Sequence, residues 1–224
     1  NLTIAIVGAT GAVGAVALDL LADRAYPAER IITMASSRSA GKKIPYLDTE
    51  LIVIEATPDS FEGVDVAFIS ASADVSRALA PEAVKRGALV IDDGSAFRMD
   101  PDVPLVVPEV NGADLEWHKG IVSIPNCTTT PLAMSLAALG QANSVKRVTV
   151  ATYQAVSGTG AAAVRELDEQ AGDLLAGRPV NPREYPHQIA FNVLPQVDDF
   201  AEDGYTGEEH KMINETRKIL HNAE

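Results

Sequence analysis

The first 24 residues read as a strand, a glycine-rich loop and a helix in direct succession. Residues Leu2–Val7 (LTIAIV) form an apolar run of strand length, typical of a strand buried on both faces of a parallel sheet. The loop at residues 8–14 has the sequence GATGAVG, and residues 15–24 have an apolar helical pattern. In this context glycines permit a tight turn and let a pyrophosphate approach backbone N–H groups. We therefore predict a nucleotide-binding loop; a glycine-rich turn that serves packing alone is the alternative.

The next part of the chain alternates between expected strands and helices. Apolar runs of strand length lie at residues 31–34, 64–69 and 88–91, and the last two flank a predicted helix at residues 76–86. This alternation indicates an α/β fold, a Rossmann-type doubly wound parallel sheet. Ligands bind such sheets at the carboxyl ends of the strands. We expect three loops to converge there, at residues 8–14, 70–74 and 92–98.

The loop after the second expected strand favours NADP over NAD as the cofactor. An NAD site usually places an acidic residue here, which binds the ribose 2′-hydroxyl. Residues 35–43 instead read ASSRSAGKK. The guanidinium of Arg38 and nearby hydroxyls such as that of Ser39 suit a 2′-phosphate. A solvated basic loop is the alternative.

Cys127 is the single cysteine of the chain, in the segment IPNCTTTP at residues 124–131. It lies between an apolar run at residues 120–124 and a predicted helix at residues 132–139. A thiol at a strand-to-helix turn faces the positive end of the helix dipole, which favours the nucleophilic thiolate. Because free cysteines are often buried as small apolar residues, a core filler is the alternative. One cysteine permits no internal disulfide and gives no zinc-ligand spacing, so we expect no metal site.

Three further polar positions occur where ligands are expected. Arg98 closely follows a strand, a position that suits an anion-binding arginine. Gln154 lies beyond an expected strand at Arg147–Thr152 and before a predicted helix at Ala161–Leu175, at the edge where a polar substrate would bind. The last predicted helix, Thr206–His221, carries Glu208 and Lys211 on one face, a spacing that usually means a solvated ion pair.

Charge and hydropathy limit the partners and the location. The net charge of −13 disfavours nucleic acid and anionic membranes as main partners, although a small anion can still bind local basic groups. No apolar stretch approaches the roughly 20 residues that span a bilayer, and the N-terminus opens directly into a strand. We therefore expect a cytoplasmic protein. Since the last predicted helix ends close to Glu224, we also expect a truncated chain.

Six segments in this order resemble aspartate-β-semialdehyde dehydrogenase, specifically the bacterial NADP-dependent branch. They are GATGAVG (8–14), SRSAGK (37–42), PDVPLVVPEVN (101–111), PNCT (125–128), TYQAVSG (152–158) and IAFNVLP (189–195). The resemblance implies reductive dephosphorylation of L-4-aspartyl phosphate to L-aspartate 4-semialdehyde, in lysine, threonine and methionine biosynthesis. It also implies a thioester on Cys127, an NADP-binding domain at residues 1–125, and a catalytic and dimerisation domain of α+β type at residues 126–224. A homodimer or homotetramer is expected.

The same resemblance assigns roles to individual residues. Asn126 adjoins the nucleophile and orients it or the thioester, while Gln154 positions the acyl group. Arg98 and Lys211 match phosphate-binding residues, and Glu208 matches the glutamate that meets the substrate amine. The positions expected to contact NADP are Gly8, Thr10, Gly11, Ala12, Val13, Arg38, Ser39, Ser157 and Gly158.

The resemblance also indicates functional groups outside the chain. The family's catalytic histidine and its substrate-carboxylate arginine lie beyond the last predicted helix, so we expect them past Glu224. The four histidines present do not lie in that histidine motif and are interpreted as structural or solvated: His118, His187, His210 and His221. Two alternatives remain open, an enzyme like N-acetyl-glutamyl-phosphate reductase and an NADP-binding fragment without activity.

Overall fold

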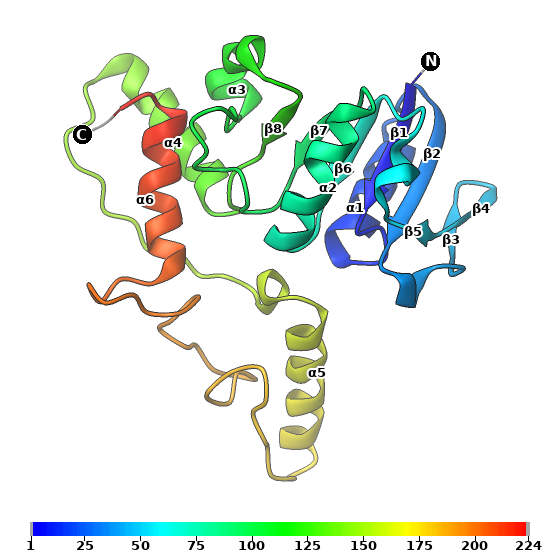
Figure 1. Ribbon diagram of the computed structural model, residues 1–224. Helices are drawn as coiled ribbons and strands as arrows, with labels where there is room; N and C mark the ends of the chain where they lie inside the picture. Colours follow the sequence, from blue (N-terminus) through cyan, green and yellow to red (C-terminus); the bar gives the residue numbers. More distant parts are fainter. Residues whose placement is uncertain (1, 223–224) are drawn as a thin grey trace. The chain divides into compact units, whose positions relative to one another are not determined.

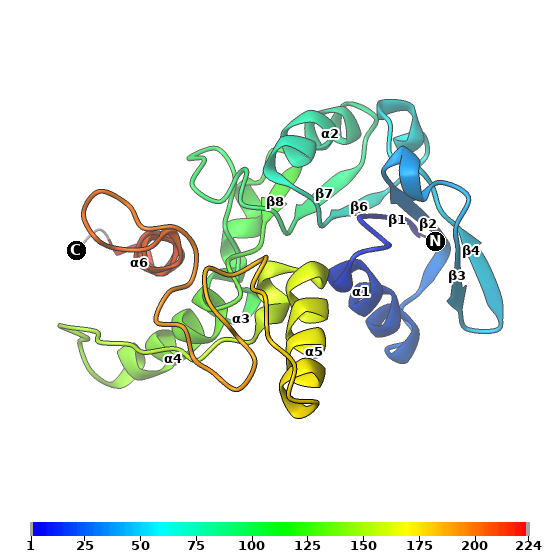
Figure 2. The same cartoon turned by 90° about the horizontal axis from the view of Figure 1, so that it is seen from below.

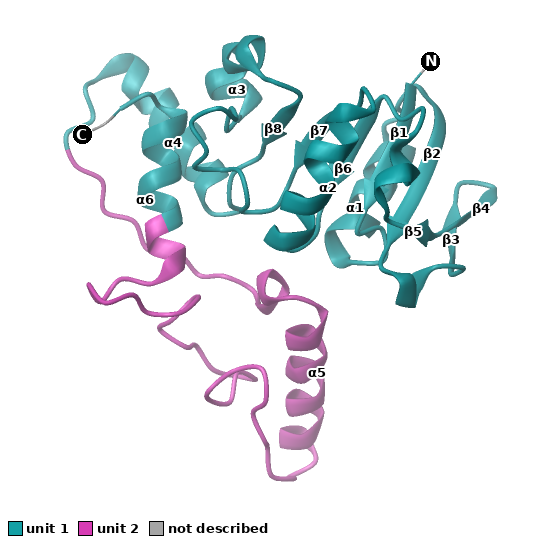
Figure 3. Cartoon of the chain, viewed as in Figure 1, with its two compact units in different colours: residues 1–146, 211–224 teal, residues 147–210 magenta. Residues whose placement is uncertain are grey.

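The computed structural model describes residues 2–222, which form two compact units. Unit 1 comprises residues 1–146 and 211–224, and unit 2 comprises residues 147–210 (Figure 3). Each unit is described by itself below.

Unit 1 is built on a parallel sheet of six strands in the order β5-β2-β1-β6-β7-β8 (Figure 1). The strands are β1 (Leu2–Val7), β2 (Ala28–Ala35), β5 (Ile54–Glu55), β6 (Val66–Ile69), β7 (Leu89–Asp92) and β8 (Ile121–Ser123). The chain moves outward from β1 first in one direction, to β2 and β5, and then in the other, to β6, β7 and β8. This order confirms the predicted doubly wound sheet. Its switch point lies at the carboxyl ends of β1 and β6, the neighbouring strands between which the strand order reverses.

Short helices and a hairpin complete unit 1. The helices are α1 (Ala12–Asp23), α2 (Ala73–Lys85), α3 (Pro108–Asn111) and α4 (Thr129–Ala142), with 3-10 turns η1 (Ser37–Ser39), η2 (Pro58–Phe61) and η3 (Gly112–Trp117). The antiparallel hairpin consists of β3 (Lys43–Tyr46) and β4 (Thr49–Ile52). Helix α6 (Gly207–Ile219) begins in unit 2 and ends in unit 1.

Each face of the sheet has its own apolar core. Successive residues of a strand point to opposite faces. Accordingly, Ile4 and Ile6 of β1 pack in one cluster with Leu18 of α1, while Ala5 and Val7 pack in a second cluster that includes Leu79 of α2. Helices α1 and α2 therefore cover opposite faces of the sheet, as Figure 2 shows.

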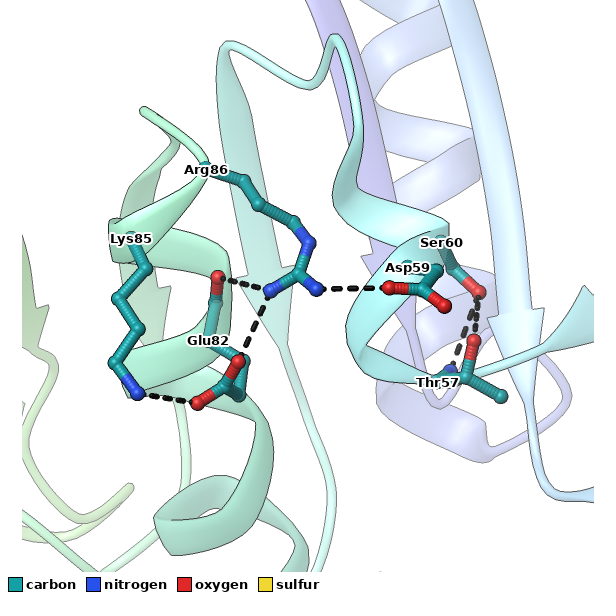
Figure 4. A network of polar contacts seen from close by, with 6 residues as sticks. All are labelled: Thr57, Asp59, Ser60, Glu82, Lys85 and Arg86. Atoms are coloured by element: carbon teal, nitrogen blue, oxygen red, sulfur yellow. Dashed lines mark hydrogen bonds and ion pairs between the residues drawn. The ribbon is translucent and has the colours of Figure 1, made fainter.

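A polar network joins the turn η2 to the end of α2 (Figure 4). Arg86 donates from Nη2 to Asp59 Oδ1 at 2.8 Å and from Nη1 to Glu82 Oε2 at 3.0 Å. Glu82 also accepts a bond from Lys85, and Ser60 bonds to Thr57. The network lies at the surface and ties the β5–β6 connection to the helix.

Unit 2 contains the turn η4 (Val156–Thr159) and the helix α5 (Ala161–Leu175), which has the predicted bounds. Two buried side chains of α5 bind the segment that returns past it. Glu166 Oε2 accepts backbone N–H bonds from residues 183 and 184, and Gln170 Oε1 accepts N–H bonds from residues 189 and 190. Hydrogen bonds to these two side chains, rather than pairing with another helix or strand, therefore hold this segment beside α5.

The prediction of a strand at Arg147–Thr152 is wrong. These residues have no regular secondary structure, and Val148 and Val150 are exposed. A strand exists only where a neighbouring strand accepts and donates its ladder bonds. In the part of the chain that the structure describes, both sheets are assembled from other segments. Across residues 2–222, no helix combines the length and apolarity needed to cross a membrane.

Candidate active site

The glycine loop is held tightly at the end of β1. The N–H groups of Gly8 and Ala9 both donate to the carbonyl of Met34 in β2, at 2.9 and 3.1 Å. Gly8 has φ +86°, and a Cβ placed on it would lie 2.0 Å from the carbonyl oxygen of Ser70. A Cβ on Gly14 would lie 2.3 Å from the carbonyl oxygen of Gly8. Glycine is therefore required at both positions by the close packing of the loop against its neighbours.

The start of α1 has the properties of a phosphate site. Its N-cap residue, Gly11, has no side chain to bond the first N–H groups of the helix, and residues 10–13 are exposed. Such N–H groups bind phosphate well. Arg38 and Ser39 lie in η1, directly after β2, the strand that pairs with β1. The loop and this basic turn therefore follow adjacent strands, an arrangement that fits a dinucleotide.

The loops after β1, β6 and β7 meet as predicted. Ser70, after β6, approaches Gly8 closely and donates from Oγ to Asp93 Oδ2 at 2.8 Å. Asp92, the last residue of β7, is fully buried and accepts a bond of 2.6 Å from Ser76 of α2. Burial raises the pKa of the Asp92 carboxyl, and the bond from Ser76 opposes this effect.

Arg98 is buried and fixed from two sides. Its Nη2 donates to the carbonyl of Asp93 at 2.8 Å, and its Nη1 donates to Glu215 Oε1 at 3.2 Å. Only 8% of the residue is exposed. Its Nε has no hydrogen-bond partner among residues 2–222. A guanidinium is a donor group suited to an anion.

Cys127 is exposed, so the core-filler interpretation does not fit the structure. It precedes Thr128, the N-cap residue of α4. The side-chain amide of Asn126 contacts both of the residues that follow it. Its Nδ2 donates to Thr128 Oγ1 at 2.9 Å, and its Oδ1 lies 3.9 Å from Cys127 Sγ. The carbonyl of Asn126 accepts from the Thr130 N–H at 3.2 Å. An accessible thiol is thus presented at the N-terminus of a helix of 14 residues.

Glu215 of α6 connects the cysteine loop to Arg98. Its Oε1 accepts from Arg98, and its Oε2 accepts from the backbone N–H of Asn126 at 2.7 Å. The residue is 2% exposed. One side chain therefore holds both the candidate anion-binding group and the residue before the candidate nucleophile.

Lys218 secures the Arg98 loop through its backbone. Its Nζ donates to the carbonyls of Arg98, Asp100 and Val103 at 2.8, 2.6 and 2.8 Å. Burial lowers the pKa of this ammonium, while the nearby charge of Asp100 acts in the opposite direction. The loop after β7 is consequently held by two residues of α6.

In unit 2 the structure brings together two of the predicted site residues. Gln154 Nε2 donates to Glu208 Oε1 at 3.0 Å, and Gln154 Oε1 accepts from Thr152 Oγ1 at 2.8 Å. Glu208 is buried at the start of α6. Gln154 also lines an open hollow with Leu167 of α5 and residues 189 and 191–193. Ser157 and Gly158 lie in the exposed turn η4.

Sequence reasoning missed Glu215 and Lys218, although α6 carries a signal for them. Residues 208, 211, 215 and 218 are spaced by three, four and three, which places them in one stripe along the helix. Their charges alternate between acidic and basic. Two of the four, Glu208 and Glu215, are buried, which a solvated stripe would not be.

Three of the four histidines contact nearby polar groups through their rings. His118 Nδ1 accepts from the Gly120 N–H, His210 lies beside Asp203, and His221 Nε2 lies 3.1 Å from Asp114 Oδ1. His187 is exposed. Within the described residues, no group of three His, Cys, Asp or Glu side chains has an arrangement that could hold a metal ion.

Two family descriptions match the chain over most of its length. Residues 3–118 match "Semialdehyde dehydrogenase, NAD binding domain", and residues 136–224 match "Semialdehyde dehydrogenase, dimerisation domain". The chain is 52% identical to the aspartate-semialdehyde dehydrogenase of Bacillus subtilis (strain 168) over 228 residues. This alignment covers 99% of the chain and 66% of the relative. The chain thus spans slightly less than two thirds of the length of this relative.

Solved structures give the same result. Aspartate semialdehyde dehydrogenase II from Vibrio cholerae, in a crystal structure described as complexed with ASA, has a TM-score of 0.96 and 39% identity. That match covers 99% of this chain and 67% of the other. A more distant match is the Candida albicans enzyme, described as solved with NADP, with a TM-score of 0.54, 29% identity, and coverage of 62% of this chain and 47% of the other. The chain belongs to the aspartate-semialdehyde dehydrogenase family.

Proposed function

We propose that the protein converts L-4-aspartyl phosphate to L-aspartate 4-semialdehyde, and the reverse, through a thioester on Cys127. The observation that carries this proposal is the joint placement of an exposed thiol at the start of α4 and a buried arginine held by the same carboxylate, Glu215. A nucleophile next to an anion-binding group suits a substrate that is both an acyl donor and a phosphate. This reaction is a step in lysine, threonine and methionine biosynthesis.

The proposed chemistry has two stages. The Cys127 thiolate attacks the acyl carbon, a C–S bond forms, and the C–O bond to phosphate breaks, so that phosphate leaves with the bonding electrons. The second stage returns the thiolate when the C–S bond breaks and the aldehyde departs. Bound NADPH would supply the hydride for this stage. Dividing one difficult step into two is the usual advantage of covalent catalysis.

We assign the polar residues as follows. Arg98 and Lys211 bind the phosphate, and Gln154 orients the acyl group. Glu208 binds the substrate amine, and Asn126 orients the thiol or the thioester. The hydrogen bond from Gln154 to Glu208 supports a shared role for these two side chains at one end of the substrate.

The domain and partner assignments follow the same proposal. Residues 1–125 would bind NADP, and residues 126–224 would carry the catalytic and dimerisation functions. The match of residues 136–224 to a dimerisation domain supports a homodimer or homotetramer.

The substrate is tested by phosphate-dependent reduction of NADP in the complete protein. We expect rapid turnover of aspartate 4-semialdehyde and at least about a hundredfold lower kcat/KM for N-acetyl-glutamate semialdehyde, because a site built for one polar end group rejects another strongly. Omitting phosphate should stop the reaction. Faster turnover of the N-acetylated substrate would instead identify the related N-acetyl-glutamyl-phosphate reductase activity.

We propose NADP as the cofactor, held by residues 8, 10–13, 157 and 158 and, at the 2′-phosphate, by Arg38 and Ser39. The exposed Arg38 after β2 and the NADP in the description of the Candida albicans structure support this choice. Loss of a hydrogen bond to a charged group weakens binding by about ten- to a hundredfold.

We therefore expect Arg38→Ser to raise the Kd of NADP by that factor and to leave the Kd of NAD within about twofold. Titration of each cofactor by calorimetry measures both constants. Arg178→Ser, at a surface ion pair with Asp173 in unit 2, serves as the matched control and should change neither constant. An equal loss of affinity for NAD and NADP would contradict a role for Arg38 at the 2′-phosphate.

A further inference from the structure

Glu215 lies between two hydrogen-bond donors that belong to different loops. Arg98 Nη1 donates to one carboxylate oxygen at 3.2 Å, and the Asn126 N–H donates to the other at 2.7 Å. Arg98 and Glu215 are 8% and 2% exposed. Arg98 comes from the loop after β7, while Asn126 comes from the loop between β8 and α4.

A carboxylate can accept hydrogen bonds at both of its oxygens. A glutamine of the same shape would present an N–H₂ group to one of the two donors. A buried donor that faces another donor is left unsatisfied, which is strongly unfavourable. Either the arginine or the cysteine loop would then have to move.

The contact with Glu215 helps to fix the orientation of the Arg98 guanidinium. The bonds from Nη1 to Glu215 and from Nη2 to the carbonyl of Asp93 fix the plane of the guanidinium. Its buried Nε lacks a partner within residues 2–222. The Lys218 ammonium additionally holds the Arg98 carbonyl at 2.8 Å.

We propose that Glu215 is a positioning residue for the phosphate site: it holds Arg98 and the Cys127 loop in the one relative placement that allows a phosphate to bind beside the thiol. This inference rests on the proposed function, because it takes phosphate as the anion that Arg98 binds. In this proposal Glu215 acts through Arg98 and Asn126 and does not itself contact the substrate.

A simpler role for Glu215 predicts the opposite result. If the carboxylate only balanced the charge of Arg98, its replacement by glutamine would remove a negative charge and make the electrostatic potential around Arg98 more positive. Phosphate would then bind more tightly. An aspartate would preserve the charge and therefore the wild-type affinity. Positioning instead requires the full length of the side chain, and aspartate is shorter by about 1.5 Å.

The test uses Cys127 as the reporter, because it is the single cysteine of the chain. The rate of its alkylation by iodoacetamide is followed by intact mass at increasing inorganic phosphate, with ionic strength held constant by chloride. The concentration of phosphate that halves the rate measures binding beside the thiol. The variants are Glu215→Gln and Glu215→Asp. The matched control is Thr216→Val, which removes the neighbouring buried hydroxyl on the same helix, an atom without a hydrogen-bond partner among residues 2–222.

We expect phosphate to protect the wild-type thiol, and both Glu215 variants to need at least about tenfold more phosphate for the same protection. Thr216→Val should match the wild type. A purely structural loosening would change the alkylation rate without phosphate but not the half-protecting concentration. Thermal unfolding of each variant shows that it is folded, and Glu215→Asp decides the matter if Glu215→Gln does not fold.

Two results would overturn the proposal and can be told apart. Unchanged or tighter phosphate binding in the Glu215 variants, with normal protection of the wild type, would exclude positioning by Glu215 and leave the proposed function standing. Absence of phosphate protection in the wild type would contradict the phosphate site itself, and both proposals would then fail.

Discussion

Cys127→Ala is expected to reduce phosphate- and NADP-dependent turnover of aspartate 4-semialdehyde in the complete protein by at least about four orders of magnitude, since removal of a covalent nucleophile has effects of that size. Without the thiol no thioester forms, and the remaining residues can bind the substrates but cannot link the two stages of the reaction. The measurement is the initial rate of NADPH formation at saturating substrate and phosphate.

The variant should retain cofactor binding, because the glycine loop lies at the end of β1 and does not involve the cysteine loop. The Kd of NADP should stay within about twofold of the wild type, as expected for a substitution away from the contacts. Ser135→Ala, an exposed position on the same helix α4, provides the control for nonspecific effects on turnover. Turnover of Cys127→Ala within tenfold of the wild-type rate would exclude the covalent role.

Gly8→Ala is expected to lower the free energy of unfolding by about 3 kcal/mol, from overpacking and from a left-handed backbone that is unfavourable for alanine. The added Cβ would lie 2.0 Å from the Ser70 carbonyl oxygen, and φ is +86°. Because the Ser70 oxygen belongs to the backbone at the end of β6, it cannot rotate away. The loop must shift, so NADP binding should weaken by at least about tenfold as its N–H donors are displaced.

Gly140→Ala provides a matched control with the opposite sign. Gly140 lies in α4, and an added Cβ would have no neighbour within 4 Å among the residues that the structure describes. Alanine in a helix is favoured over glycine by up to about 1 kcal/mol, so this variant should be more stable than the wild type. Urea unfolding measures both variants. Equal stability of Gly8→Ala and the wild type would show that the loop does not pack as described.

The fold of unit 1 could be predicted because its local signals agree with one another. The apolar run Leu2–Val7 and the glycine spacing that follows indicate a buried parallel strand and a tight turn, and the later apolar runs at β2 and β6 supply the strand's partners. The convergence of the loops then follows from parallel topology. The expected strand at Arg147–Thr152 had an apolar pattern of the same kind, but a strand also requires a partner. A single segment of sequence does not reveal whether that partner is available.

The candidate site was only partly predictable, for a related reason. Arg98, Asn126 and Cys127 lie in short motifs beside strand ends, where sequence position alone suggests chemistry. The role of Glu215 depends on contacts with residues 117 and 89 positions away in the chain. Helical spacing places Glu215 and Lys218 in a stripe with Glu208, but burial is what distinguishes this stripe from a solvated face.

The most direct test of the central proposal is the intact mass of the complete protein after mixing with L-4-aspartyl phosphate in the absence of NADPH. We predict one covalent aspartyl adduct, located on Cys127 by peptide mapping, lost on addition of NADPH and absent from Cys127→Ala. A wild-type protein that turns over the substrate without any adduct on Cys127, or with an adduct on another residue, would contradict the proposed thioester mechanism.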